Sequence, residues 1–430
     1  MRRVSRTGGL AAAASAATGV AVAFALALAP AAGAATTVDL SKFRKLRDVT
    51  KGLDVAVLRP LLDRGEVALI EHLSGAAFSQ ISIFALVDAP PAKVQYVVAH
   101  PEEFPKFVPN VAKSALSGAS PDGTEFDIDY SIEVPLMNMD GRNHTKVAPD
   151  YVEIWGTSGD LREGHWIYRF VPVDGGSKTL LAYTGYNDPR KAGAIFKKLV
   201  DENPILEAGI NCAGGMVLVR AVKRRALELA GRKPPIPVVS GKIASLHSML
   251  AGDKKIDAAA VTPFLKGGEL ALIESNPDGS LMQGSMIAVI NKSIADTYAV
   301  VGTPEKYSEF VPHVTESKLV KTEGDSKFIA WRVTSPVGDV KFENKFRGWP
   351  AKRTHLVATG GDIKVGAWGW ELRELTPTST FAVYYNYADL RGGGFVLRKM
   401  IETDPSFEHG LNVANSLTMM LAVKKRVEGP

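Results

Sequence analysis

The side chains best able to do chemistry in this chain are eight histidines and one cysteine. The histidines are His72, His100, His144, His165, His247, His313, His355 and His409. None of them stands at a metal-ligand spacing from another histidine or from Cys212. The sequence also contains no G-x-S-x-G nucleophile elbow and no G-x-x-x-x-G-K-S/T phosphate loop. We therefore assign no metal site, no cofactor and no catalytic residue from these motifs.

Cys212 and a run of three glycines could also carry chemistry, but each has a simpler interpretation. Cys212 lies in an apolar helical pattern, which is typical of a small buried hydrophobic side chain rather than a reactive thiol. A chain with one cysteine forms no intrachain disulfide, so its domains must be stabilised by their cores. The glycines at 392–394 stand just before a helical pattern, where they favour a turn rather than a phosphate site.

The first 34 residues have the composition of a cleaved secretory signal peptide. Arg2, Arg3 and Arg6 form a positive region, an Ala-rich apolar stretch follows over 10–29, and Ala-Gly-Ala at 32–34 fits a cleavage site. An uncleaved membrane anchor is the alternative. Removal of these three arginines lowers the formal net charge from +5 to +2, which gives no electrostatic reason to expect a nucleic-acid partner. We predict a periplasmic or secreted protein.

Most of the remaining chain consists of two sequence repeats. LLDRGEVALIE (61–71) returns as FLKGGELALIE (264–274), an offset of 203 residues. DENPILEAGIN (201–211) returns as ETDPSFEHGLN (402–412), an offset of 201 residues. The predicted divisions are a signal peptide at 1–34, a first domain with an N-terminal helix at 35–230, a proline-rich linker at 231–242 and a second domain with an N-terminal helix at 243–430.

Each copy presents the same order of expected elements. A helical opening, at 40–62 or 243–265, leads into two strands and a short helical region. Several alternating strands with Gly, Asp and Pro turns follow, and a long helix closes the copy. Proline is expected to break that helix near 203–204 and 404–405. A curved antiparallel sheet with one apolar helix across it is the natural packing for this order.

This order, together with PEEFPKFVPNV (101–111) and PEKYSEFVPHV (304–314), resembles the START-like (SRPBCC) superfamily. The likeness is greatest to its polyketide cyclase/dehydrase and coenzyme Q-binding branch, and it covers about 64–230 and 267–428. The resemblance implies an α+β fold of two tandem helix-grip domains, each a curved antiparallel β-sheet wrapped around a long C-terminal α-helix. It also implies an internal apolar cavity, but not one chemistry.

Strand alternation selects the side chains that we expect to face the cavity. Trp166 and Tyr168 lie opposite the charged Arg169, and in the last strand we select the faces that carry Tyr186 and Tyr385. The ligand-binding candidates are Ile128, Tyr130, Trp166, Tyr168, Tyr186, Leu206, Ile210, Asn211, Trp331, Trp368, Trp370, Tyr385, Tyr387, Phe407, Leu411 and Asn412. The alternative for each is simple core filling. The two asparagines could instead cap a helix or bond to a neighbouring strand.

The two copies differ at several of these positions. Tyr130 corresponds to Trp331, and His165 corresponds to Ala367. We therefore expect two similar cavities with different interiors. Cyclases of this superfamily use an Arg, Asp, Tyr or His inside the cavity. The available polar side chains are Arg142, His144, His165, Arg332, Arg347 and His355, but alternation places most charges outward.

The function that we expect is binding or carriage of a hydrophobic small molecule, such as a lipid, a sterol- or hopanoid-like molecule or a quinone. An exported carrier would shield such a molecule from water and make transient contact with a membrane. One alternative is an aromatase/cyclase or dehydratase acting on a polyketide-like substrate, although secretion separates the protein from cytoplasmic thioester chemistry. The other is a non-catalytic interaction module with collapsed cavities. Nothing in the sequence predicts an oligomeric state.

Overall fold

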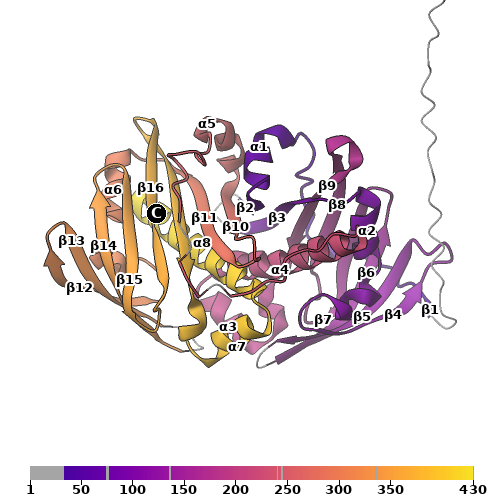
Figure 1. Ribbon diagram of the computed structural model, residues 1–430. Helices are drawn as coiled ribbons and strands as arrows, with labels where there is room; N and C mark the ends of the chain where they lie inside the picture. The colour runs from indigo at the N-terminus through magenta and orange to yellow at the C-terminus, as the bar shows by residue number, and fades with distance from the viewer. Residues whose placement is uncertain are drawn as a thin grey trace, which may run out of the picture.

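The computed structural model shows two copies of one fold joined by a continuous antiparallel sheet (Figure 1). The described residues are 33–73, 77–134, 137–239, 241–243, 246–334 and 338–429. The predicted signal peptide therefore lies outside the described residues, apart from β1 (Gly33–Ala34), which pairs in parallel with Gly118 and Ala119.

The first repeat runs from β2 to α4 and follows the predicted order of elements. Its strands are β2 (Gly65–His72), β3 (Phe78–Val87), β4 (Val111–Ala119), β5 (Glu125–Val134), β6 (Met137–Val147), β7 (Tyr151–Gly159), β8 (His165–Val173) and β9 (Lys178–Tyr186). Its helices are α2 (Pro91–Ala99), η2 (Pro101–Lys106), η3 (Asp174–Gly176), η4 (Pro189–Ala192), α3 (Ala194–Glu202) and α4 (Ile205–Leu229). Two short helices precede it, η1 (Leu40–Lys42) and α1 (Val55–Leu62).

The second repeat runs from β10 to α8 in the same order. Its strands are β10 (Gly268–Ser275), β11 (Leu281–Ile290), β12 (Val314–Glu323), β13 (Ser326–Val333), β14 (Val340–Trp349), β15 (Arg353–Gly361), β16 (Gly366–Thr376) and β17 (Ser379–Ala388). Its helices are α6 (Ile294–Val301), η6 (Pro304–Glu309), η7 (Leu390–Gly392), α7 (Phe395–Thr403) and α8 (Ser406–Glu428). The helices α5 (Ala258–Val261) and η5 (Thr262–Lys266) precede it.

Strand pairing makes each repeat a curved antiparallel sheet. The order in the first repeat is β2-β3-β9-β8-β7-β6-β5-β4. The second repeat has the matching order β10-β11-β17-β16-β15-β14-β13-β12. Antiparallel pairing of β2 with β10 joins the two sheets at the centre of the molecule. Figure 1 shows the outer strands of both repeats as wings on either side of α4 and α8.

A pseudo-two-fold axis relates the repeats. In the central pair of strands Ala68 lies opposite Ala271, which is the same position of the other repeat. The helices α4 and α8 also meet symmetrically. A Cβ added to Gly209 would lie 3.0 Å from Ala414 Cβ, and one added to Gly410 would lie 2.8 Å from Ala213 Cβ. The same glycine–alanine contact is thus made twice, and these small residues allow the helix backbones to approach closely.

The break in each long helix is confirmed. In the first repeat α3 ends at Glu202 and α4 begins at Ile205, just after Pro204. The second repeat breaks in the same way before Ser406. Within the described part of the chain α4 alone is long and apolar enough to cross a membrane, but more than half of its most apolar stretch is buried, and it packs on β3 and α8.

The predicted opening helices at 40–62 and 243–265 are wrong over most of their length. In the first segment only η1 and α1 are helical, and in the described part of the second only α5 and η5 are. Gly52 and Gly252 have φ values of 77° and 75°, in the left-handed region that an α-helix excludes. Both segments instead cover the outer face of the central strands, across the junction of the repeats. We call this face the outer layer, and the face toward α4 and α8 the inner layer.

The inner layer confirms the predicted face for β8 and β16 but not for the last strand. Trp166, Tyr168 and their counterparts Trp368 and Trp370 pack in the inner layer. In the last strands the inner residues are Leu181, Tyr183, Ala382 and Tyr384, whereas Leu180, Ala182, Phe381 and Val383 pack in the outer layer. These strands are covered by apolar groups on both faces, so alternation provided no polar side from which to choose.

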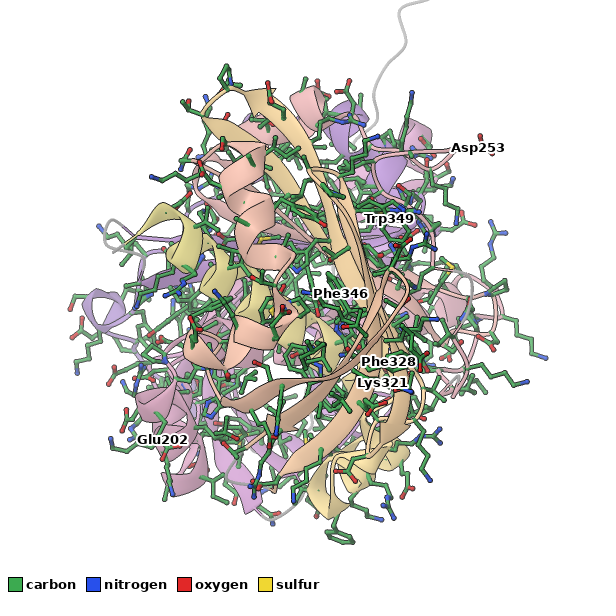
Figure 2. The ribbon with its side chains drawn as sticks, turned by 90° about the vertical axis from the view of Figure 1, so that its left-hand side faces the viewer. Glu202, Asp253, Lys321, Phe328, Phe346 and Trp349 are labelled. Atoms are coloured by element: carbon green, nitrogen blue, oxygen red, sulfur yellow. The ribbon has the colours of Figure 1, made fainter. Side chains whose placement is uncertain are left out.

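The outer strands of the second repeat have one buried face and one solvent-exposed face, so alternation of residue types can distinguish the two (Figure 2). Phe346 on β14 is buried in the inner layer. On β12 and β13, Lys321 Nζ lies 4.4 Å from the centre of the Phe328 ring. Phe328 is only half-buried and Lys321 is exposed, so this pair lies toward solvent. These outer strands therefore have one face exposed to solvent and one face turned to the interior of the molecule.

Candidate functional site: a cavity shared by both repeats

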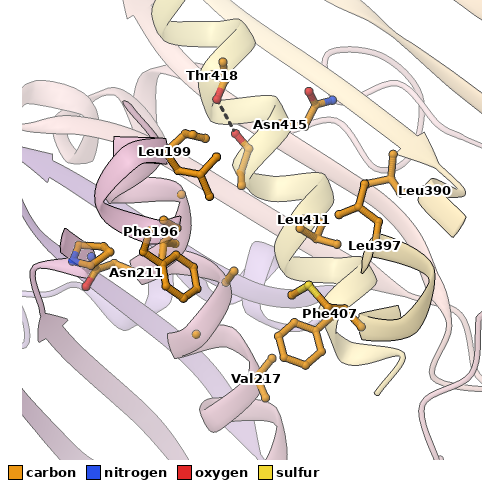
Figure 3. A pocket seen from close by; sticks show the side chains of 18 of the residues that line it. Phe196, Leu199, Asn211, Val217, Leu390, Leu397, Phe407, Leu411, Asn415 and Thr418 are labelled. Carbon is orange, nitrogen blue, oxygen red and sulfur yellow. Dashed lines mark hydrogen bonds between the residues drawn. The ribbon is translucent and has the colours of Figure 1, made fainter. Parts of the chain in front are cut away.

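A cavity of about 640 Å³ lies between the inner layer and the helices α3, α4, α7 and α8. Both repeats line it, so the expectation of two separate cavities is corrected by the structure. Figure 3 shows Phe196 and Leu199 of α3 and Leu397 of α7 beside Phe407 and Leu411 of α8. We call this space the shared cavity. Gly209 of α4 and Ala414 of α8, which form one of the glycine–alanine contacts, both line it.

The walls of the shared cavity match position by position between the repeats. Matching wall pairs are Trp166 with Trp368, Tyr183 with Tyr384, Phe196 with Leu397, Leu206 with Phe407 and Ile210 with Leu411. Strands supply the aromatic rings and helices supply most of the aliphatic groups. The pseudo-two-fold axis thus relates two lobes of one cavity, one lobe in each repeat.

The duplicated Phe-Val-Pro segment ends on the cavity wall in both repeats. Asn110 and His313 follow the prolines and have φ values of 62° and 65°, in the left-handed region. The carbonyl oxygen of Asn110 accepts a hydrogen bond from Glu133 N at 2.7 Å, and that of His313 accepts one from Thr334 N at 2.8 Å. The segment therefore fixes the end of β5 or β13 and places one polar side chain in each lobe.

The shared cavity is uncharged. None of its described lining residues is an Asp, Glu, Lys or Arg. Burial raises the pKa of the Tyr183 phenol well above its ordinary value and has the same effect on the pKa of Tyr384. Both phenols are therefore neutral. His313 is the remaining titratable side chain among the described lining residues.

Three buried nitrogen atoms on the cavity wall lack a partner among the described residues. They are Trp331 Nε1, His313 Nε2 and Asn203 Nδ2. Trp331 is 5% exposed and Asn203 is 3% exposed, so their polar atoms have little access to water. Buried polar groups in folded proteins nearly always have a hydrogen-bond partner. These atoms are therefore unpaired polar atoms of lining residues, and a water-sized group does not reach them in this structure.

Half of the predicted ligand-binding candidates line the shared cavity. Those that do are Trp166, Leu206, Ile210, Asn211, Trp331, Trp368, Phe407 and Leu411. Those that the structure places elsewhere are Ile128, Tyr130, Tyr168, Tyr186, Trp370, Tyr385, Tyr387 and Asn412. Tyr168 and Trp370 lie in the inner layer, where their rings pack against Tyr183 and Tyr384 at 5.1 Å and 4.9 Å between centres. They support the wall from behind.

The tyrosines of the last strands serve other contacts. Tyr385 donates to Thr354 O at 3.1 Å and lies beside His355, with its ring outside the cavity. Tyr186 donates to Glu207 at 3.0 Å. Tyr387 makes the corresponding contact with Glu408 at 3.4 Å. Tyr186 and Tyr387 therefore join the ends of β9 and β17 to the first turn of the long C-terminal helix of each repeat.

Asn211 and Asn412 tie the closing helix to the end of the last strand. Asn211 Oδ1 accepts from Asn187 N at 2.9 Å, and its amide nitrogen donates to Asn187 O at 2.9 Å. Asn412 makes the same two bonds with Ala388, at 3.0 Å and 3.1 Å. The amide of Asn211 is therefore already engaged, although the residue lies on the cavity wall.

None of the six polar side chains considered for cyclase chemistry lines the shared cavity: Arg142, His144, His165, Arg332, Arg347 and His355. His144 Nδ1 lies 2.9 Å from Asp127, and His165 Nε2 lies 2.8 Å from Glu153. The ring of Trp155 lies between the two imidazoles, 5.8 Å and 5.6 Å from their centres. These histidines are partners of carboxylates in the sheet, away from the cavity.

Sequence reasoning missed several wall residues. Tyr183 and Tyr384 were missed because of the alternation error in the last strands. Phe196 and Leu397 were missed because they precede the break in the long helix. The signal that could have found them is the offset of 201 residues, which aligns both pairs. No sequence signal indicated that the two lobes join.

Comparisons with known proteins gave a family match over much of the second repeat. Residues 290–417 match the family model described as polyketide cyclase / dehydrase and lipid transport. No curated protein matches the chain. Among solved structures, the di-domain ARO/CYC BexL from the BE-7585A biosynthetic pathway is 13% identical, over 82% of this chain and 99% of that chain, with a TM-score of 0.26. A STAR-related lipid transfer protein fragment from Xanthomonas axonopodis is 18% identical, over 38% and 93%, with a TM-score of 0.29.

TM-scores of this size do not by themselves establish a common fold. The assignment rests on the family match, which spans β11 to α8, and on the observed order of a curved antiparallel sheet and a long C-terminal helix. The first repeat has the same order of elements and the same sequence landmarks. The second repeat therefore matches the polyketide cyclase / dehydrase and lipid transport family over residues 290–417, and both repeats have the helix-grip order of elements.

Proposed function

We propose that this protein binds and carries one hydrophobic small molecule in the shared cavity. The observation that carries this proposal is a continuous cavity of about 640 Å³ whose described wall is mainly apolar and aromatic. None of its described lining residues is an Asp, Glu, Lys or Arg. Cavities of roughly 300–1,000 Å³ are typical of small-molecule sites. An apolar cavity of about 150 Å³ can hold one benzene molecule, so this one has room for roughly four rings or an equivalent chain.

The composition of the wall favours binding over catalysis. General acid–base chemistry needs a titratable group within hydrogen-bond reach of the reacting atoms. The carboxylates and arginines near the sheets form ion pairs elsewhere, as Arg142 does with Asp129 at 2.7 Å. The phenols of Tyr183 and Tyr384 are held neutral by burial. His313 is the one imidazole among the described lining residues, and no carboxylate among them is available to pair with it. Binding without turnover is therefore the function that this wall supports best.

Exchange of the ligand through a membrane contact is part of the proposal. The helices α3 and α7 carry cavity-lining side chains on one face and exposed residues on the other. Phe395 is 72% exposed, and the exposed basic residues Arg398 and Lys399 follow it. Ile195 is 40% exposed and also lines the cavity, so it lies at the cavity's edge. Apolar tips beside basic residues suit contact with an anionic lipid surface. The signal-like N-terminus supports an exported carrier.

The direct test is to identify what the purified full chain contains. Native mass spectrometry would give the mass of any bound molecule, and denaturing mass spectrometry would give its identity. We expect one apolar molecule per chain, because the two lobes form a single cavity. Two molecules per chain, or a protein that binds neither a native molecule nor an added polycyclic hydrocarbon, would contradict the proposal.

A cavity-filling variant tests the location. Gly214 lines the cavity, and a Cβ added to it would meet no atom within 4 Å. Gly214→Leu should therefore fill the space without a backbone clash and reduce binding of fluorene at least tenfold, measured by quenching of intrinsic fluorescence. The matched control is Gly360→Leu, because Gly360 also has open space around it but does not line the cavity. Equal effects of the two substitutions would count against this location.

A further inference from the structure

We infer that the outer face of the sheet of the second repeat is a docking surface for a membrane that contains anionic lipids. This surface lies on β13, β14 and β15, on the side turned away from the inner layer. It is separate from the shared cavity and from the contact at α3 and α7 proposed for ligand exchange. The inference therefore goes beyond the proposed function and does not depend on it.

Exposed basic side chains gather on this surface, which we call the basic face. Strand alternation places it opposite Ile329, Phe346 and Leu356, which are buried in the inner layer. Its five cations are all exposed: Arg332 of β13, Lys341, Lys345 and Arg347 of β14, and Arg353 of β15. Glu343 is the one acidic residue at the outward positions of these three described strands.

Most of this positive charge is not neutralised within the protein. Arg332 pairs with Asp339 at 2.7 Å, and Arg347 lies 3.7 Å from Asp325, whose side chain is 86% exposed. The cations that form no ion pair with another described residue are Lys341, Lys345 and Arg353. Exposed cations without acidic partners attract an anionic surface over about a Debye length.

The first repeat shows that the fold does not require a basic face. The residues at the five equivalent positions are Ser131, Asp140, His144, Lys146 and Tyr151. They include one lysine and one aspartate, where the second repeat has five cations. Two more outward positions differ in the same sense, because Asp127 and Asp129 correspond to Phe328 and Ala330. The basic face is thus particular to the second repeat, and packing of the sheet does not explain it.

Aromatic rings lie between the cations of the basic face. The ring centre of Trp349 is 5.1 Å from the guanidinium carbon of Arg347 and 4.1 Å from that of Arg353. Phe328 has Lys321 beside its ring in the same way. Figure 2 views the molecule from this side, with Trp349 above Phe328 and Lys321. Tryptophan beside arginine or lysine is typical of protein surfaces at the headgroup level of a membrane.

The edge of the same sheet favours a membrane over a nucleic acid. On β12, Leu319 is 41% exposed and Val320 is 50% exposed. A nucleic acid would use the cations and the rings, but it would leave these aliphatic groups in water. A lipid surface accepts all three kinds of side chain, because basic residues bind its anionic headgroups and apolar groups enter its interface.

Trp349 provides a direct test, because it is the only one of the six tryptophans that is not buried. The probe is a vesicle of one-third phosphatidylglycerol in phosphatidylcholine whose acyl chains are brominated, which quenches tryptophan at the lipid interface. We expect these vesicles to quench the fluorescence of the full chain and to bind it at least tenfold more tightly than vesicles of phosphatidylcholine alone. Trp349→Phe should abolish the quenching and leave sedimentation with the vesicles within threefold. The predicted signal peptide contains no tryptophan, so a contact made by it would not give this signal.

Charge reversal tests the location. A variant with Lys341→Glu, Lys345→Glu and Arg353→Glu should bind the anionic vesicles at least tenfold more weakly and lose the quenching, while its affinity for fluorene stays within twofold. The matched control reverses three exposed lysines of the first repeat by the changes Lys51→Glu, Lys106→Glu and Lys113→Glu. Both variants lower the formal net charge by the same amount, and the control should keep most of the vesicle binding.

Four results would each overturn the inference: no quenching of Trp349, equal binding to neutral vesicles, an equal loss in the two charge-reversal variants, or complete displacement of the vesicles by double-stranded DNA at equal phosphate concentration. The proposed function would stand in each case, because binding of fluorene in the cavity is measured separately. Conversely, a chain that docks on vesicles as expected but binds no apolar molecule would contradict the proposed function and leave this inference intact.

Discussion

At the scale of single residues, equivalent positions of the two repeats have acquired different charge partners. In the first repeat Glu207 pairs with Arg190 at 3.1 Å. Arg190 also binds Asp188 at 2.9 Å, and the corresponding Arg391 binds Asp389 at 2.7 Å, but none of the described ion pairs joins Arg391 to Glu408. Glu408 is left buried with the Tyr387 hydroxyl at 3.4 Å. Burial raises the pKa of Glu408 to about 8, and the Asp389 carboxylate adds to the rise.

This carboxyl should make the stability of the protein depend on pH. The folded protein keeps the Glu408 proton up to about pH 8, whereas an ordinary glutamate loses it near 4.5. Between pH 4.5 and about pH 8 the folded state therefore binds more protons than the unfolded state. The contribution of Glu408 to stability is present below pH 4.5 and is lost as the pH rises through the folded pKa. Glu408→Gln should raise the free energy of unfolding at about pH 8 and flatten its pH dependence, measured by urea denaturation at several pH values.

Glu207→Gln provides the comparison in the other repeat. Glu207 has an arginine partner, so the same change should remove an ion pair and lower the free energy of unfolding. An unchanged pH slope in the Glu408 variant would show that this carboxyl is not the source of the dependence.

At the scale of secondary-structure elements, the residues at the two ends of α3 and α7 position these helices along the cavity wall. Gly193 and Gly394 begin these helices with φ values of 119° and 115°, which L side chains rarely adopt. Asn203-Pro204 ends α3, and Pro204 precedes the first residue of α4. The helix is thus set at an angle to α4, with Phe196 and Leu199 directed into the cavity (Figure 3).

Gly193→Ala should loosen this arrangement. Backbone strain of this kind costs about 1–3 kcal/mol, and the protein can relieve it by moving α3 away from the cavity. We expect faster amide hydrogen exchange over 194–202 and weaker binding of fluorene. Gly175→Ala is the control, because Gly175 has a φ of 68° but lies in the β8–β9 turn, away from the cavity. It should lower stability and leave binding intact; weakened binding in both variants would argue against a specific role for α3.

At the scale of the whole molecule, the duplication builds one site rather than two. The central strands and the crossing of α4 with α8 lie on the same pseudo-two-fold axis, and each is built from equivalent residues. A shift of one repeat relative to the other would change both lobes of the cavity together. The junction is therefore a part of the binding site as well as a connection between domains.

Gly410→Ala tests this coupling. The added methyl would lie 2.8 Å from both Cα and Cβ of Ala213, and backbone cannot move aside easily. We expect the free energy of unfolding to fall by about 1–3 kcal/mol and fluorene binding to weaken, by urea denaturation and fluorescence titration. Gly214→Ala is the control in the partner helix, where the space is open and the change should stabilise by up to about 1 kcal/mol. Intact binding in Gly410→Ala would mean that the lobes act independently.

Local pattern was enough to predict the elements of each repeat. Proline predicted the break between α3 and α4 because it has no backbone N–H and its ring clashes with the preceding turn of a long helix. Alternation predicted the inner face of β8, where Trp166 and Tyr168 oppose Arg169, because one face of that strand is polar. It failed for β9, where Leu180 and Leu181 are both buried. It also failed to show that the opening segments form only short helices.

The sequence by itself determined that one fold is present twice, that its second copy matches the polyketide cyclase / dehydrase and lipid transport family, and that aromatic side chains line its interior. Those properties follow from residue type, local spacing and repetition. The tertiary structure alone decided that the two interiors join, because residues of α3, α4, α7 and α8 that are far apart in the sequence line one cavity. It also decided which polar atoms are paired, because the partners come from residues distant in the sequence. The Tyr130 hydroxyl is paired with Leu161 N, whereas Trp331 Nε1 has no partner among the described residues.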